Sequence, residues 1–278
     1  MATDLNVDNA AIAAKAELIK RETDQQILDR LIARFENLDD MTHSVKQGKI
    51  RALIVQGPPG VGKTHGVRKI LARDGSMDIL KHGGPQHQIV MGAASSLGLY
   101  MKFFEFKETG NTVVFDDCDS ILYEDRSLQL LKGALDSSIV RHLSWNYDSN
   151  SLRREGIPND FEYKGSAIII TNVKFDLVRS KKLRAHLKAI EDRCHSLDLG
   201  MDTIREKMIW VRYHAMHDML LGYTDEEKKE ILDFMYENQD NLTDISLRML
   251  TKIADCYKFW PEKWKDKARM SCMIRLRR

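Results

Sequence analysis

Eight consecutive residues have the types and spacing needed to hold phosphate groups. They are Gly57, Pro58, Pro59, Gly60, Val61, Gly62, Lys63 and Thr64. Glycines let consecutive backbone N–H groups turn toward phosphate oxygens, because no side chain blocks the approach. In this pattern the lysine reaches the β- and γ-phosphates, and the threonine hydroxyl ligates Mg²⁺. An apolar run at 53–55 precedes the loop, and a helical pattern that includes Val67 and Leu71 follows it. The positive end of that helix would face the same anion, so the segment predicts a nucleoside triphosphate site.

Two adjacent acids, Asp116 and Asp117, follow a second apolar run at residues 112–115. A carboxylate that ends a buried parallel strand beside a phosphate loop can hold Mg²⁺ through water. The second acid can orient or deprotonate an attacking water. The alternative is that Asp117 and Asp119 cap the next helix. The sequence predicts Asp116 as the cation residue and leaves both interpretations of Asp117 open.

Strands and helices are expected to alternate over the first 200 residues. This pattern is typical of a parallel sheet covered by helices on both faces. The expected strands are 52–56, 88–91, 112–115 and 167–171, and the expected helices are 8–48, 97–106 and 127–138. Beyond residue 200 only helical patterns are found, at 203–220, 225–237 and 242–257. We therefore expect a helical leader (1–48), an α/β nucleotide-binding domain (49–200) and a small helical domain with a basic tail (201–278).

Taken in order, these motifs resemble those of the AAA+ ATPases. The run 112–117 resembles their Walker B strand, and residues 168–172 resemble the sensor 1 strand, which implies that Asn172 helps to position the attacking water. Residues 189–194 resemble the family's arginine-finger box, which implies that Arg193 reaches the nucleotide of a neighbouring subunit. Arg184 is the alternative finger, because the spacing from Asn172 to Arg193 is long. Residues 245–250 resemble the sensor 2 helix of the lid domain, with Arg248 facing the phosphates.

The resemblance implies an α/β core with a helical lid, ATP and Mg²⁺ as ligands, and assembly into a homo-oligomeric ring, expected to be a hexamer. The compact chain and short leader are also similar to AAA+ proteins encoded by tailed bacteriophages. One departure concerns Walker B, where most members have Asp-Glu and this chain has Asp116 and Asp117. Because aspartate is one methylene shorter, the water would have to sit closer, and hydrolysis could be slow.

Three further segments bear on the macromolecular substrate. Residues 139–166 read as a projecting hairpin, similar to the pre-sensor 1 hairpin of AAA+ helicases and unfoldases. Its Arg153 and Arg154 either contact a nucleic-acid backbone or belong to an exposed loop, where their charges only face water. Residues 98–104 could form an aromatic pore loop, but their helical spacing favours core packing. The C-terminal run from residue 258 combines basic residues with Phe259, Trp260 and Trp264, so it suits either a polyanion or lid packing.

The overall composition excludes few partners. The chain has 43 basic and 41 acidic residues, a net charge of +2, so no global field demands a nucleic acid or a membrane. No apolar stretch is long enough for a membrane span, and the N-terminus lacks a secretion signal. The four cysteines are scattered and make no zinc spacing, which suits free thiols in a cytoplasm, that of the host if the protein is viral. Cys118 is expected to be a small buried residue.

Three functional hypotheses remain at this point. The first is a ring-forming ATPase that remodels nucleic acid or a protein–DNA assembly, in a replication or recombination role. The second is a protein unfoldase or chaperone-type motor, which an aromatic pore loop would favour. The third is an ATP-gated scaffold that hardly hydrolyses, which the short Asp117 would favour.

Overall fold

The computed structural model describes residues 21–73 and 86–274. The first part of the expected leader, the glycine-rich break around 74–84 and the last basic residues of the tail lie outside the described residues. The chain divides into two compact units. Within the described residues, one combines 34–58 with 63–73 and 86–199, and the other combines 21–33 and 59–62 with 200–274.

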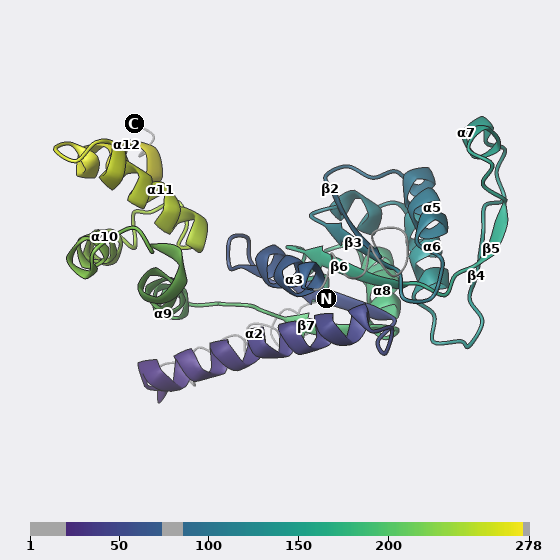
Figure 1. Cartoon of the computed structure of the whole chain (residues 1–278), viewed down its shortest axis with the longest axis horizontal. Helices are drawn as coiled ribbons and strands as arrows, with labels where there is room; N and C mark the ends of the chain where they lie inside the picture. The colour runs from purple at the N-terminus through teal and green to yellow at the C-terminus, as the bar shows by residue number, and fades with distance from the viewer. Residues whose placement is uncertain (1–20, 74–85, 275–278) are drawn as a thin grey trace. The chain divides into compact units, whose positions relative to one another are not determined.

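A five-stranded parallel sheet forms the centre of the first unit (Figure 1). The strand order is β2-β3-β6-β1-β7. The bounds are β1 Ala52–Gln56, β2 His87–Met91, β3 Thr112–Asp116, β6 Ser166–Thr171 and β7 His195–Asp198. Four of these strands were expected from the sequence, whereas β7 was not. It lies at the sheet edge and reads His-Ser-Leu-Asp, so it carries no apolar run to signal a strand.

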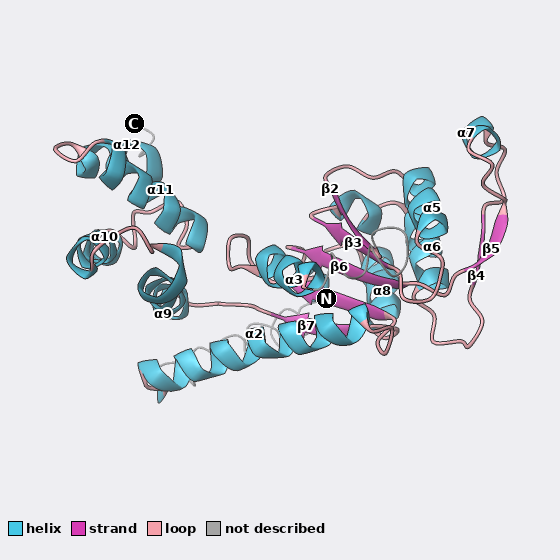
Figure 2. Ribbon diagram, viewed as in Figure 1, coloured by secondary structure: helices cyan, strands magenta, loops and turns pink. Residues whose placement is uncertain are grey.

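The two faces of the sheet are covered by different helices (Figure 2). Side chains alternate along a strand, so Ile54 packs into one cluster and Leu53 into the other. The Ile54 face is covered by α5, α6 and α8, and the Leu53 face by α3 and the C-terminal half of α2. The helix bounds are α2 Asp24–Lys46, α3 Lys63–Ala72, α5 Ser96–Glu105, α6 Asp125–Ala134 and α8 Lys181–Glu191. The parallel sheet covered on both faces is the expected fold class.

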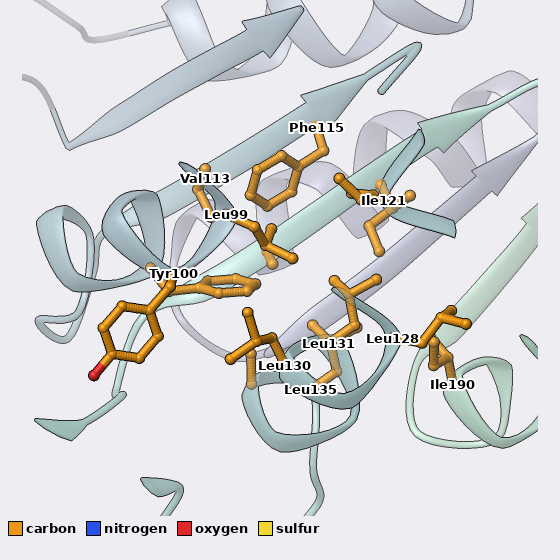
Figure 3. Packing of buried hydrophobic residues seen from close by; sticks show 14 of the residues in the cluster. Leu99, Tyr100, Val113, Phe115, Ile121, Leu128, Leu130, Leu131, Leu135 and Ile190 are labelled. Atoms are coloured by element: carbon orange, nitrogen blue, oxygen red, sulfur yellow. The ribbon is translucent and has the colours of Figure 1, made fainter. Parts of the chain in front are cut away.

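Helix α5 settles the two interpretations of residues 98–104 in favour of core packing. Leu99 and Phe103 are fully buried, and Phe106 is nearly so. Phe103 meets Phe115 of β3 edge to face, with ring centroids 5.6 Å apart. Figure 3 shows α5 and α6 contributing side chains to this cluster. Cys118 is buried as expected, and burial raises the pKa of its thiol.

The segment between α6 and β6 forms the expected hairpin, with one difference. Its strands β4 (His142–Ser144) and β5 (Asp160–Glu162) pair antiparallel. The polar middle, expected to be irregular, contains a short helix, α7 (Asn150–Arg154). The Ser149 hydroxyl caps this helix by accepting from the Leu152 N–H, and the Leu152 side chain is buried. An N-cap with an apolar anchor thus makes a helical turn where the polar composition indicated a loop.

The second unit contains the C-terminal helices. They are α9 Ile204–His214, the π-helical turn η3 Ala215–Met219, α10 Asp225–Glu237, α11 Leu247–Phe259 and α12 Trp264–Cys272. α11 begins five residues later than expected because Ser246 is its N-cap. α12 was not expected, since its basic residues mask the apolar positions Trp264, Ala268 and Cys272 that it buries. Within the part of the chain that the structure describes, no helix has the length and apolarity to cross a bilayer.

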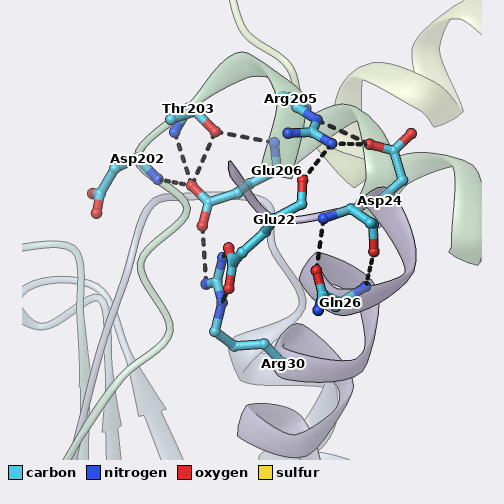
Figure 4. A network of polar contacts seen from close by, with 9 residues as sticks. Glu22, Asp24, Gln26, Arg30, Asp202, Thr203, Arg205 and Glu206 are labelled. Carbon is cyan, nitrogen blue, oxygen red and sulfur yellow. Dashed lines mark hydrogen bonds and ion pairs between the residues drawn. The ribbon is translucent and has the colours of Figure 1, made fainter. Parts of the chain in front are cut away.

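A buried charged network joins α9 to the start of α2 within this unit (Figure 4). Glu206 has no exposed surface, and its carboxylate accepts from the N–H groups of Asp202 and Thr203 at the N-terminus of α9. Its other oxygen accepts from Arg30, 3.1 Å away, which also pairs with Glu22 at 2.7 Å. A carboxylate with several donors is stable when buried, because each desolvated oxygen keeps a hydrogen bond.

Candidate nucleotide-binding site

The phosphate loop connects β1 to α3 and depends on glycine for its shape. Gly60 and Gly62 have φ values of +73° and +108°, in the region that L side chains rarely adopt. Lys63 is the first residue of α3, and its side chain is nearly buried. Its ammonium group donates to the carbonyls of Gly57 and Pro58, at 2.7 and 2.9 Å, and to Asn172 Oδ1 at 2.7 Å. The positive charge of Lys63 is therefore held at the loop by three oxygen acceptors, whose place phosphate oxygens can take when a nucleotide binds.

Asn172 connects the loop lysine to the acids that follow β3. Because β1, β3 and β6 are parallel neighbours, their carboxyl ends lie at the same edge of the sheet. Asn172 directly follows β6, and its amide nitrogen donates to Asp117 Oδ1 at 2.8 Å. Its amide oxygen accepts from Lys63. The Asn172 amide thus holds the Lys63 ammonium group and the Asp117 carboxylate close together at the carboxyl edge of the sheet.

Asp116 offers a carboxylate suited to a divalent cation. It ends β3 and is fully buried. One oxygen accepts from the Thr64 hydroxyl at 3.0 Å, whereas the other, Oδ2, is buried without a hydrogen-bond partner. Burial raises the pKa of Asp116, an effect that the Thr64 hydrogen bond opposes and the nearby Asp117 charge reinforces. An unsatisfied carboxylate oxygen beside a hydroxyl fits Mg²⁺, which prefers oxygen ligands.

The described residues contain no cluster of three or more His, Cys, Asp or Glu side chains that could hold a metal ion. Mg²⁺ bound with a nucleotide does not need such a cluster. It usually takes one or two protein ligands and completes its shell with water and phosphate oxygens. Thr64 and Asp116 are therefore sufficient as protein ligands only if a nucleotide is bound as well.

Asp117 has an unusual backbone. It is the one non-glycine residue with positive φ (+52°) among the residues that the structure describes. Its N–H donates to the Ile170 carbonyl of β6 at 3.1 Å, which fixes the turn. The helix-cap alternative is not what the structure contains. The N-cap of η1 (Asp119–Leu122) is Cys118, with no side-chain cap, and Asp119 accepts from Thr171 instead. The turn presents the exposed Asp117 carboxylate to Asn172, and such a backbone costs about 1–3 kcal/mol and is commonest at functional sites.

The tip of the phosphate loop is bonded to the helical unit to which it belongs. The buried indole of Trp210 in α9 donates to the Val61 carbonyl at 3.0 Å. The N–H of Leu247, the first residue of α11, donates to the Gly60 carbonyl at 3.0 Å. When the N–H groups of the loop turn toward phosphates, its carbonyl groups point away from them. The Gly60 and Val61 carbonyls are in this position, and each accepts a hydrogen bond from the helical unit. The sequence did not suggest Trp210, because a buried tryptophan in a helix gives no signal of a contact with a distant loop.

The predicted arginines lie in three different settings. Arg248 is exposed in the first turn of α11, and a Cβ added at Gly60 would be 3.6 Å from its Cγ. Arg193 follows α8 and pairs with Asp136 at 3.3 Å, while also donating to the Ala189 carbonyl. Arg184 is half-buried and directs two donors to the Val178 carbonyl, at 2.9 and 2.7 Å. Both candidate fingers are therefore bonded within their own chain, Arg184 to one carbonyl and Arg193 to a carbonyl and a carboxylate.

Comparison with known proteins gives one relative of clear sequence similarity. It is the "Uncharacterized 36.7 kDa protein in nrdC-mobD intergenic region" of Enterobacteria phage T4, 33% identical over 258 residues, covering 91% of this chain and 77% of the relative. No protein-family model matches the chain.

Solved structures give similarity at the level of fold. Domain III of the Thermotoga maritima replication initiation protein DnaA is 13% identical with a TM-score of 0.47, covering 85% of this chain and 91% of that one. PCH-2 of C. elegans is 13% identical with a TM-score of 0.40, covering 87% and 67%. The chain belongs to the same family as the phage T4 protein, and its parallel sheet, phosphate loop and C-terminal helical unit have the architecture of the AAA+ fold.

Proposed function

We propose that this protein binds ATP with Mg²⁺ and hydrolyses the terminal phosphate. The observation that carries the proposal is the chain of contacts from Lys63 through Asn172 to Asp117, beside the Thr64–Asp116 pair. Lysine, hydroxyl, buried carboxylate and exposed carboxylate converge at the carboxyl edge of one parallel sheet. This is where nucleotides bind in open α/β sheets.

Each residue has a defined role in this proposal. Lys63 and the loop N–H groups bind the β- and γ-phosphates, and Arg248 adds a second positive charge beside Gly60. Thr64 and Asp116 hold Mg²⁺, which when bound neutralises charge on the phosphates. Asp117 accepts a proton from the attacking water, and Asn172 keeps that carboxylate in position.

Aspartate in place of the usual glutamate shortens the reach of the base. The positive φ of Asp117 and its hydrogen bond from Asn172 fix the direction of the short side chain. Because a fixed general base needs no conformational search, the geometry favours hydrolysis over a purely ATP-gated scaffold.

A complete site would use Arg193 from a second copy of the chain. Arg193 pairs with Asp136, and both side chains are about one-third exposed. Such a pair is weak in solvent and can exchange for a nucleotide phosphate of a neighbour. We therefore propose a homo-oligomeric ring, with Arg193 as the finger and the helices of 201–278 as the lid.

For the substrate, we propose nucleic acid or a protein–DNA assembly in the host cytoplasm, in a phage replication or recombination role. The burial of α5 weighs against an aromatic pore loop and so against the unfoldase alternative. The projecting β4–α7–β5 hairpin offers a surface for either substrate.

Phosphate release by the full chain tests the proposal. ATP hydrolysis should require Mg²⁺, and Lys63→Ala should abolish both tight ATP binding and turnover, because the loop loses its charge on the phosphates. Single-stranded DNA, duplex DNA and RNA should be added in separate arms, and acceleration by one of them would identify the substrate. ATP binding by Lys63→Ala as tight as that of the parent would overturn the assignment of the loop.

A further inference from the structure

The turn between α11 and α12 exposes two neighbouring aromatic rings among lysines. We define the α11–α12 corner as Lys258, Phe259, Trp260, Lys263 and Lys267. We propose that this corner binds a single-stranded nucleic acid, with bases stacked on the two rings and phosphates contacted by the three lysines. This deepens the proposed function by naming the substrate class, although the binding itself requires neither ATP nor turnover.

Phe259 and Trp260 are exposed, unlike the other phenylalanines and tryptophans that the structure describes, although Tyr123, Tyr147 and Tyr236 are exposed as well. Trp260 is 48% exposed and Phe259 is 63% exposed, whereas Trp145, Trp210 and Trp264 are at most 6% exposed. Burying a large aromatic side chain stabilises a fold by about 1.5–3 kcal/mol, so a fold gains nothing by leaving two adjacent rings in water. The rings meet edge to face, with centroids 6.2 Å apart at 71°.

The corner is held rigidly by the helices on either side. The Trp260 N–H donates to the Cys256 carbonyl at 3.0 Å, and the Lys263 N–H donates to the Trp260 carbonyl at 3.0 Å. Just after the turn, Trp264 is buried against Phe234 and Tyr257, with ring centroids 5.1 Å apart in each pair. Trp264 thus anchors the turn while Trp260 stays outside, so a ligand would meet a preformed surface.

The charge around the rings favours an anionic partner. Lys258, Lys263 and Lys267 are exposed, and the Lys267 ammonium lies over the Trp260 ring, 5.7 Å from its centroid. Two acids share the segment, Glu262 and Asp266, and Asp266 is paired with Arg269 at 3.2 Å.

Rings flanked by cations match the chemistry of a single strand. Its bases offer flat faces for stacking and its backbone offers one phosphate per nucleotide. In a duplex the base faces are already stacked on one another, so the two rings would have nothing to bind. The corner should therefore prefer single strands.

The test uses fluorescence anisotropy of a labelled oligodeoxythymidine of about 16 nucleotides, the upper end of common site sizes. The full chain should bind it with and without ATP. Trp260→Ala and Phe259→Ala should each weaken binding by about 5-fold to 160-fold, the range typical of one lost base stack. Lys267→Ala should weaken binding at low salt and make it less salt-dependent, by about 0.7 in the log–log slope.

Tyr236→Ala is the matched control. Tyr236 is 65% exposed on α10 of the same unit. The charged residues near it in the sequence are the acids Asp233 and Glu237, which repel phosphate, in place of the lysines of the corner. Its removal should leave oligonucleotide binding unchanged. Circular dichroism of each variant checks folding, and all three substituted aromatics are exposed, so the core is not altered.

Several outcomes would overturn the inference. They are no binding by the parent, equal binding by Trp260→Ala, equal affinity for duplex DNA, or binding to phosphatidylserine vesicles but not to the oligonucleotide. Separate titrations with single-stranded RNA and single-stranded DNA show which of the two nucleic acids the corner prefers. ATP hydrolysis measured without nucleic acid should be unchanged in Trp260→Ala. Oligonucleotide binding by a parent that hydrolyses no ATP would refute the proposed ATPase while leaving this inference intact.

Discussion

Replacing Trp210 with phenylalanine tests whether the helical unit holds the phosphate loop in its binding shape. The indole N–H donates to the Val61 carbonyl at 3.0 Å, and the side chain is only 3% exposed. Phenylalanine keeps most of the apolar packing but cannot donate a hydrogen bond. The change therefore removes one interaction between α9 and the tip of the loop.

The size of the effect follows from that hydrogen bond. A typical intramolecular hydrogen bond contributes about 0.5–1.5 kcal/mol net, and a buried carbonyl left without a donor costs about 1–3 kcal/mol. If the bond mainly keeps the loop carbonyls turned away from the phosphates, its loss should weaken ATP binding about 2-fold to 12-fold. The free energy of unfolding should fall by about 1–3 kcal/mol.

The assay is titration calorimetry with ATP and Mg²⁺, together with urea unfolding of the same samples. Trp264→Phe is the matched control, because Trp264 is also buried in this unit but packs on Phe234 and Tyr257. It should lose stability while keeping the parent's ATP affinity. If Trp210→Phe also bound ATP as the parent does, the contact would serve folding alone, and our reasoning about the loop would be refuted.

Three further predictions concern the chemistry. Asp117→Asn should keep ATP bound but lower phosphate release by at least about 100-fold, the typical contribution of a positioned base, and an unchanged rate would leave the base unassigned. Arg193→Ala should bind ATP but hydrolyse it poorly, because an arginine finger contributes about 10³–10⁵ in rate. Mixing it with Lys63→Ala should restore activity, since the intact loop of one variant can then meet the intact finger of the other. Arg184→Ala is the control, and full activity of a protein that sediments as a monomer would contradict the ring. Burial raises the pKa of Asp116, so its carboxylate is protonated at a higher pH than an exposed aspartate. Mg²⁺-dependent ATP binding should therefore weaken as the pH falls toward that pKa, and a pH-independent Mg²⁺ affinity in calorimetry would argue against Asp116 as the ligand.

The sequence predicted the parts of this protein whose signal is local. The phosphate loop, the apolar strands β1, β3 and β6, and helix α10 were predicted because their composition and spacing determine their conformation. The loop needs glycine where φ is positive, and buried parallel strands need unbroken apolar runs. The order of the motifs along the chain also indicated the AAA+ fold.

Other features were decided by tertiary contacts. Strand β7 forms because the edge of β1 provides a hydrogen-bonding partner, and α12 forms because its three buried side chains pack on the other helices. The sequence left Asp117 open between base and helix cap, and only the tertiary structure shows that Asp117 does not cap the next helix and accepts a hydrogen bond from the Asn172 amide. Trp210 gave no signal at all. Its partner lies 149 residues away along the chain, and a hydrogen bond over such a separation exists only once the fold has brought the two residues together.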